Sequence, residues 1–533
     1  MLFDARSVPA DTVLEADVCV IGAGAAGITV ARTFAGTSTS VLLLESGDFE
    51  PDTETQELYA GDIVGAPMLS GYRPLELDEI RLRQFGGTTN HWAGWCRPLE
   101  PVDFTELPAR PGTSWPFGRE ELDPWYALAM AAVQAGPFEY DYAYWAAQGL
   151  GPPLLENDVV TSRMIQVSFP TRFGELYRQE LVDSSNVEIG LWANVVNLRT
   201  DDGGTHVEAA DVATLDGNRF QVEARVFVLA TGGIEVPRLL LASSDVQADG
   251  LGNDHDLVGR YFMEHLEVPA GFVVLWQPPE TLGYYDGGEF ATPPDREHET
   301  VGIKGAHLLH DDVLRDEELL GVEFTMIPVE LTDDARPDQD DGVTTLDVAE
   351  LMGRLTLARP ATVAYVRMLA EQAPNPDSRV RLLSDTDALG VPKAELDWQP
   401  TADDRTRLRR ATAIFADEIS RAGLGRLQVG VGGTIIDWED PVPGPLGTYQ
   451  VDPAEFDSID YPVGIGFHHM GTARMSNDPT RGVVDADCRV HGLENLYIGG
   501  SAVFPTSGSS TPTLTITALA LRLGAHLRTV VLA

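Results

Sequence analysis

The chain has 533 residues, of which 43% are hydrophobic, a composition that is ordinary for a globular protein of two large domains or lobes. It carries 82 acidic residues against 37 basic ones, a formal net charge of −45. Such a field repels a phosphate backbone and an anionic membrane surface, which argues against nucleic acid and membranes as partners. Plain solubility, adaptation to high salt and attraction of a cationic substrate remain open explanations of the charge.

Cysteine usage and the two chain ends indicate the compartment. Three scattered cysteines are too few for a disulfide framework or a metal cluster. The N-terminus has an acidic start and runs directly into a strand pattern, without the basic and apolar regions of a secretion signal. The apolar C-terminal stretch contains Arg522 and Arg528 and predicts a buried helix rather than a membrane span. We therefore expect a cytoplasmic protein with no metal site and no membrane insertion.

The N-terminal region predicts one βαβ unit. An apolar run at 16–21 is followed by the glycine-rich turn 22–27, a helix-like stretch at 28–36 and a second apolar run that ends at Glu45. Residues 48–79 are polar and irregular. Further elements are then expected in chain order: a helix within 119–136, strands within 187–198, 206–215 and 219–230, and a helix over 235–243.

The second half of the chain has a different pattern. β-rich pieces occur at 268–276, 321–331 and 379–398, an amphipathic helix interrupts the pattern at 403–423, and a last helix begins near Pro512. This order predicts a β-rich lobe inserted between pieces of an α/β lobe.

Gly22, Gly24 and Gly27 form a G-x-G-x-x-G motif between a predicted strand and helix, with Ala25 and Ala26 inside it. Such glycines let the backbone turn tightly and approach a pyrophosphate at a helix N-terminus, while a carboxylate at the end of the next strand, here Glu45, accepts hydrogen bonds from a ribose diol. The motif predicts dinucleotide binding, and both NAD and FAD use it.

The C-terminal stretch GFHHMGTARM, with the later GVVD, RVHG, VFPTSG and PTLTITALA segments, resembles the closing segment of the glucose-methanol-choline (GMC) oxidoreductases, a family of FAD enzymes that oxidise alcohols. RQFGGTTNHWAGW at 83–95 is similar to the pyranose-oxidase and bacterial sugar-dehydrogenase branch. The resemblance implies a discontinuous Rossmann-like FAD-binding lobe of residues 1–105, 160–267 and 464–533. It also implies an inserted β-rich substrate-binding lobe of residues 106–159 and 268–463.

The resemblance also places residues beside FAD. In pyranose oxidases the histidine of the segment similar to GGTTNHW is joined covalently to the flavin, so His91 is either a covalent attachment point or a noncovalent wall of the flavin site. Val195 matches the position whose backbone meets the adenine. The other positions implied to contact the cofactor are Gly86, Gly87, Asn90, Ala230, Gly232, Gly500, Ser501, Thr511, Pro512 and Thr513.

Alcohol oxidation requires a base beside the flavin, because the hydroxyl proton must leave while the α-hydrogen leaves as hydride. Imidazole suits this role, since its pKa lies near neutrality. The resemblance assigns the base to His468, three residues before Gly471. The neighbouring His469 is either a packing residue or a substrate contact, and the predicted site includes it as a substrate-binding residue. His265, near the join of the lobes, is expected to be a core histidine.

Thr511 occupies the position where GMC relatives commonly have Asn or His. With Pro512 it also has the pattern of a helix N-cap followed by a first helical residue, so it is either a structural cap or a residue that orients substrate. The N-terminus of the helix that follows is expected to face the flavin edge where negative charge accumulates on reduction.

The sequence therefore predicts FAD-dependent oxidation of a CH–OH group of an alcohol, sugar or glycoside, by an oxidase or a dehydrogenase. An aminoglycoside, steroid or aromatic alcohol is an alternative substrate, and a noncatalytic dinucleotide-binding protein is the alternative from another class. Oxygen, a quinone or a redox protein is expected to take the electrons back, and the oligomeric state stays open.

Overall fold

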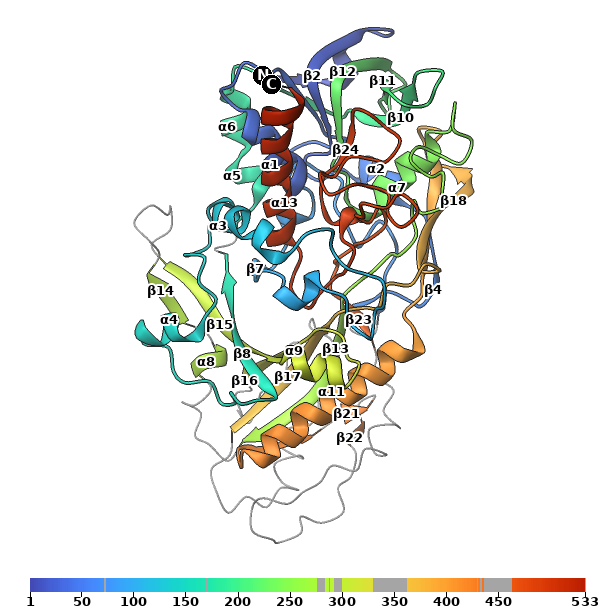
Figure 1. Cartoon of the computed structure of the whole chain (residues 1–533). Helices are drawn as coiled ribbons and strands as arrows, with labels where there is room; N and C mark the ends of the chain where they lie inside the picture. The colour runs from blue at the N-terminus through green and yellow to red at the C-terminus, as the bar shows by residue number, and fades with distance from the viewer. Residues whose placement is uncertain are drawn as a thin grey trace.

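The structure is a computed structural model that describes residues 1–70, 73–168, 171–275, 283–286, 288–291, 300–328, 362–428, 430–431, 434–435 and 463–532. These residues form two lobes, one above the other in Figure 1, with both chain ends at the top of the upper lobe. The upper lobe is α/β and the lower lobe is built on a large antiparallel sheet.

The upper lobe is organised around an eight-stranded sheet. Its order is β1 (Leu2–Asp4), β9 (Val187–Leu191), β3 (Val41–Leu44), β2 (Val13–Ile21), β12 (Arg219–Leu229), β11 (Val207–Ala213) and β10 (Asn194–Thr200), with β24 (Leu496–Ile498) beside the end of β12. The strands from β1 to β12 pair in parallel, whereas β12, β11 and β10 form an antiparallel meander. Residues Val18–Ile21 and Val41–Leu44 are buried apolar runs, as expected of parallel strands that are covered on both faces.

Helices cover this sheet. Helix α1 (Ala25–Phe34) contacts α13 (Thr513–His526), and α13 also packs on α3 (Asp123–Ala132). Figure 1 shows α13 in red beside α1. Thr513–Val531 is apolar and long enough to cross a membrane. Its buried side chains, however, belong to the core of the upper lobe, and the Tyr126 and Thr515 hydroxyls hydrogen-bond at 2.9 Å.

Shorter helices complete the upper lobe. They are α2 (Thr53–Gln56), α5 (Phe173–Leu176), α6 (Arg178–Asp183) and α7 (Gly232–Ala242). Pro237 lies within α7, which follows directly on β12 and contacts β18 (Arg379–Thr386) and β19 (Pro392–Trp398).

A nine-stranded sheet forms the lower lobe. Its order is β20 (Gly425–Gln428), β13 (Leu266–Leu275), β17 (Thr362–Ala370), β16 (Val322–Pro328), β15 (Thr300–Leu309), β8 (Val160–Val167) and β7 (Trp95–Cys96), with β14 (Gly288–Ala291) on β15 and β23 (Gly464–Ile465) on β13. Helix α11 (Ala402–Arg421, orange in Figure 1) packs on it, with the Phe415 and Phe324 rings stacked at 4.2 Å. Helices α4 (Tyr142–Ala147), α8 (Gly283–Asp286) and α9 (Asp311–Asp316) surround the sheet.

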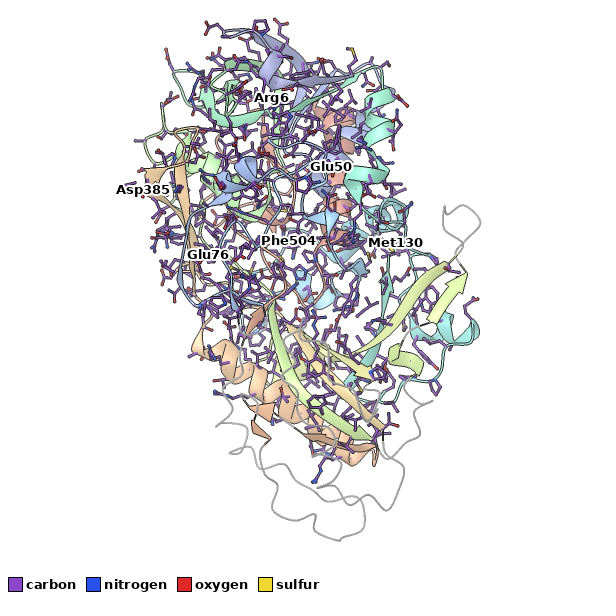
Figure 2. All side chains as sticks on the ribbon, turned by 180° about the vertical axis from the view of Figure 1, so that it is seen from behind. Arg6, Glu50, Glu76, Met130, Asp385 and Phe504 are labelled. Carbon is purple, nitrogen blue, oxygen red and sulfur yellow. The ribbon has the colours of Figure 1, made fainter. Side chains whose placement is uncertain are left out.

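Three smaller sheets complete the described structure. Strands β18 (Arg379–Thr386), β19 (Pro392–Trp398) and β4 (Asp62–Gly65) form one, and β5 (Leu69–Ser70) with β6 (Arg73–Pro74) and β21 (Gly430–Val431) with β22 (Thr434–Ile435) form two-stranded pairs. Arg238 of α7 donates to Asp387 beyond β18 at 2.7 Å. Phe504, labelled near the centre of Figure 2, packs against Trp115 with ring centroids 5.3 Å apart.

The structure differs from the expected lobe boundaries at several elements. Strands β7, β8 and β23 fall in ranges expected for the FAD lobe, but all three pair in the lower sheet. Helix α3 falls in a range expected for the substrate lobe, but its apolar side packs on α13 in the upper core. Residues 329–361 and 436–462 of the expected substrate lobe lie outside the described residues.

Candidate active site

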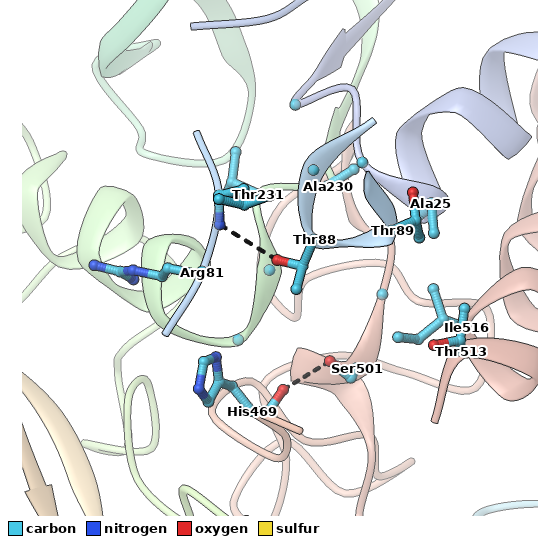
Figure 3. A pocket seen from close by; sticks show the side chains of 18 of the residues that line it. Ala25, Arg81, Thr88, Thr89, Ala230, Thr231, His469, Ser501, Thr513 and Ile516 are labelled. Carbon is cyan, nitrogen blue, oxygen red and sulfur yellow. Dashed lines mark hydrogen bonds between the residues drawn. The ribbon is translucent and has the colours of Figure 1, made fainter. Parts of the chain in front are cut away.

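A cavity of about 640 Å³ lies where the carboxyl ends of several parallel strands of the upper sheet meet the lower lobe. Residues that end or directly follow β2, β3, β12 and β24 line it. Open α/β sheets bind ligands at this edge. Figure 3 shows that Ala25 of α1, Thr88 and Thr89, Ala230 and Thr231, and the C-terminal His469, Ser501 and Thr513 surround the same space.

Most of the residues predicted at the cofactor or substrate lie in this cavity wall. They are Gly22, Gly24, Ala25, Ala26, Glu45, Gly87, His91, Val195, Ala230, Gly232, His468, His469, Gly500, Ser501, Thr511, Pro512 and Thr513. Three predicted cofactor residues, Gly27, Gly86 and Asn90, do not line it. Their contacts are with the protein backbone, so they shape the turns behind the wall.

The glycine turn has the close contacts that its motif implies. Gly22 has φ +97°, a conformation that L side chains rarely adopt. A Cβ on Gly27 would lie 1.8 Å from the Gly22 carbonyl oxygen, so helix α1 can approach the turn only without a side chain there. A Cβ on Gly24, by contrast, would meet nothing within 4 Å, so the backbone of this residue is open to the cavity at the start of α1.

Glu45 holds the turn as well as facing the cavity. One carboxylate oxygen accepts the Ala23 N–H at 2.9 Å, and the other accepts the Gly47 N–H at 3.0 Å. Because an ionised carboxylate offers about four acceptor sites, capacity remains for a ribose diol.

Two buried polar groups in the wall fit a dinucleotide. Arg81 pairs with Glu235 at 3.1 Å through one guanidinium nitrogen, but its Nε and Nη1 have no hydrogen-bond partner among the described residues. The Thr231 hydroxyl is likewise without one. Both residues line the cavity, and guanidinium N–H groups suit phosphate oxygens. With the open backbone at Gly24, these donors make the cavity suitable for FAD.

The segment that contains His91 forms a tight loop along the wall. Gly86 N–H donates to the Ala23 carbonyl at 2.8 Å, and a Cβ on Gly87 would lie 3.1 Å from Gly24 Cα. The Asn90 amide donates to the Phe85 carbonyl at 2.9 Å, which explains why Asn90 points away from the cavity. The His91 side chain is exposed and borders the cavity, and burial of part of the ring lowers its pKa.

His468 borders the cavity and contacts a second histidine. Its Nδ1 lies 2.8 Å from Nδ1 of His265, with the two rings nearly perpendicular. His265 is completely buried, and its Nε2 donates to the carbonyl oxygens of Gly508 at 2.9 Å and Ser507 at 3.2 Å. Burial holds the pKa of His468 well below the usual 6.5, with His265 and Arg367 adding to the effect, so the ring is neutral near pH 7.

Glu264 anchors the backbone of both histidines. Its carboxyl group is fully buried and accepts the backbone N–H of His468 at 2.7 Å and of His265 at 2.9 Å. Burial raises the pKa of this carboxyl to about 8. The Nε2 of His469 lies 3.7 Å from the same group without a hydrogen bond, and burial lowers the pKa of His469 to about 3.

Of the two alternatives for Thr511, the helix cap is wrong. Helix α13 begins at Thr513 after Pro512, and no side chain caps it. The Thr511 hydroxyl instead donates to the Trp95 carbonyl at 2.6 Å, because the loop passes beside β7. Thr511 lines the cavity. Because its hydroxyl hydrogen is used in the bond to Trp95, its oxygen can only accept a hydrogen bond from a substrate.

The first turn of α13 faces the cavity, since Pro512, Thr513 and Ile516 line it. Free N–H groups at a helix N-terminus favour negative charge. This end of the helix therefore lies at the cavity, as expected.

The lower lobe gives the cavity a charged wall near His468. Arg367 on β17 donates to both carboxylate oxygens of Glu267 on β13, at 2.6 and 2.7 Å. The Arg367 guanidinium also lies 5.0 Å from the centre of the Trp95 ring. All three residues line the cavity. Among the described residues, no group of three or more His, Cys, Asp or Glu side chains is arranged to hold a metal ion.

Comparisons with known proteins agree with this geometry. The family described as GMC oxidoreductase matches residues 374–520. The large subunit of fructose dehydrogenase from Gluconobacter japonicus is 25% identical over 96% of this chain and 97% of its own length. Paromamine 6'-oxidase from Streptomyces fradiae is 26% identical over 95% and 90%. The crystal structure of pyridoxine 4-oxidase from Mesorbium loti has the same fold, with a TM-score of 0.57 and 19% identity over 96% of this chain and 99% of that one.

The fold, the glycine turn and the histidine beside the cavity define an FAD-binding oxidoreductase. Residues 374–520 are similar to the glucose-methanol-choline oxidoreductases, as the family match shows.

Sequence reasoning missed two residues of the site. It assigned His265 to the core, which is correct for its burial but not for its contact with His468, and it did not single out Glu264. The available signal was an adjacent acid and histidine, Glu264 and His265, at the expected join between the lobes.

Proposed function

We propose that the protein oxidises a CH–OH group of a polyhydroxylated small molecule, such as a sugar or glycoside, to a carbonyl, with FAD as cofactor and His468 as the base. The observation that carries the proposal is the neutral His468 ring at the wall of the cavity that suits FAD.

The residues divide the work as follows. Bound FAD supplies a hydride acceptor. His468 accepts the hydroxyl proton of the substrate, which leaves an electron pair on oxygen to form the carbonyl as the α-hydrogen departs with its pair. Thr511 offers an acceptor to a neighbouring hydroxyl, and His469 provides a side wall beside Gly233.

A polar substrate is favoured by the Glu267–Arg367 pair. An apolar steroid would leave these charged groups desolvated, whereas hydroxyl groups can donate to the carboxylate and accept from the guanidinium. Relatives named for fructose and paromamine oxidation support the same class. The similarity to a family of enzymes disfavours the noncatalytic alternative. Three buried, unpaired cysteines support our proposal of a cytoplasmic location.

Anaerobic mixing of the FAD-loaded protein with a panel of monosaccharides, glycosides, amino sugars, aromatic alcohols and a hydroxysteroid tests this substrate class. We expect polyhydroxylated compounds to bleach the flavin absorption near 450 nm at rates at least about tenfold above those of the steroid and aromatic alcohols, because only they satisfy the charged wall. Faster bleaching by the steroid would overturn the polyol assignment while leaving alcohol oxidation intact.

We further propose that His91 is joined covalently to the flavin. The exposed His91 ring at the cavity wall supports this. After acid denaturation, the yellow colour is expected to stay with wild-type protein and to be released from His91→Ala. Release from both proteins would show that the attachment is noncovalent.

A further inference from the structure

The hydrogen bonds around His265 fix where its proton lies. Carbonyl oxygens can only accept, so the Nε2 atom that contacts the Gly508 and Ser507 carbonyls must carry a hydrogen. Burial lowers the pKa of His265 to about 4, so the ring is neutral near pH 7 and carries one hydrogen only. Its Nδ1 atom is therefore a lone pair that points at His468.

That lone pair determines the state of the second ring. The two Nδ1 atoms are 2.8 Å apart, and two facing lone pairs at this distance would repel. His468 must therefore carry its hydrogen on Nδ1 and donate it to His265. In the neutral ring this leaves Nε2 unprotonated, and Nε2 of His468 has no hydrogen-bond partner among the described residues.

We propose that His265 is a positioning residue that selects the Nδ1–H tautomer of His468 and so presents the basic Nε2 to the substrate hydroxyl. This inference rests on the proposed function. The substrate O–H bond breaks, its proton forms an Nε2–H bond on His468, the C–H bond breaks with its electron pair going to FAD, and the C=O bond forms. His265 loses and gains no proton.

The surroundings position both histidines. Glu264 accepts the backbone N–H of both residues, and the His468 ring packs against Gly466, where a Cβ would lie 2.4 Å from Nδ1. When His468 becomes positively charged, its Nδ1–H bond to His265 becomes charge-assisted and therefore stronger. The arrangement thus stabilises the protonated base as the proton arrives.

Two amide replacements of His265 separate the roles of its two nitrogens. Asn places an oxygen near the position of Nδ1 and can accept from His468, whereas Gln places its amide near Nε2 and can donate to the Gly508 carbonyl without offering His468 an acceptor. We expect His265→Asn to retain flavin reduction within about tenfold of wild type, and His265→Gln to lower the limiting rate constant by about 100-fold with substrate affinity and bound FAD little changed.

Equal rates in the two variants, or a faster His265→Gln, would overturn the proposal. A direct measurement that needs no substrate is NMR of protein labelled with ¹⁵N-histidine, which reports which ring nitrogen carries the hydrogen. The His468 signal is identified by its loss in His468→Ala. The proposal requires a hydrogen on Nδ1 and none on Nε2 of His468 in the wild type, and a hydrogen on Nε2 contradicts it. If no alcohol reduces the flavin but the tautomer is as expected, the proposed function fails and the role of His265 in setting the tautomer stands.

Discussion

Replacing His468 by Ala is expected to slow anaerobic reduction of the flavin by substrate by about 10²- to 10⁴-fold, the range that a positioned general base supplies. The hydroxyl proton then loses its expected acceptor, and the neighbouring His469 does not replace it, because its Nε2 lies 3.7 Å from the buried Glu264 carboxyl group. The measurement is stopped-flow absorbance at 450 nm with saturating substrate.

FAD content should be unchanged in this variant, since His468 is one of many residues in the wall. His206→Ala serves as a matched control, because His206 is a half-exposed histidine that contacts Glu494 and does not line the cavity. His468→Ala reducing its flavin at the wild-type rate would show that the base is another residue.

The second large effect is expected from Gly24→Ala. A Cβ at this position meets no protein atom within 4 Å, and its φ of −81° is accessible to alanine, so the variant should fold with a free energy of unfolding within about 1 kcal/mol of the wild-type apoprotein. The added methyl group lies in the cavity where the pyrophosphate of FAD is expected. We therefore expect the Kd for FAD to rise by about 100-fold or more, measured by titration of apoprotein.

Gly151→Ala is the control for the added methyl group, because a Cβ at Gly151 also meets nothing within 4 Å and this residue does not line the cavity. Unchanged FAD affinity in Gly24→Ala would show that the dinucleotide does not bind at the glycine turn.

The part of the site that is local in sequence could be predicted. Gly22, Gly24 and Gly27 lie between one strand and one helix, so their spacing alone specifies the turn, and Glu45 ends the next parallel strand. The apolar runs of β2, β3 and β12 likewise predicted strands of the α/β lobe, although not how these strands pair.

The long-range contacts could not be predicted. His265 and His468 are 203 positions apart and meet because β23 pairs with β13 and Met263 bridges to Met470. The residues of β8 fall in a range expected for the FAD-binding lobe. Strand β8 nevertheless pairs antiparallel with β15 and so belongs to the lower sheet. Thr511 has the sequence pattern of a cap, but its hydroxyl instead donates to the carbonyl of Trp95 on β7, 416 positions away in the chain.

A crystal structure of the FAD-loaded protein with a nonreacting substrate analogue tests the central claim most directly. We predict that Nε2 of His468 lies about 3 Å from the analogue hydroxyl, on the face of the flavin ring where the carbinol carbon is bound. A flavin ring outside this cavity, or a His468 whose Nε2 is bonded to the protein instead of the analogue, would contradict the account.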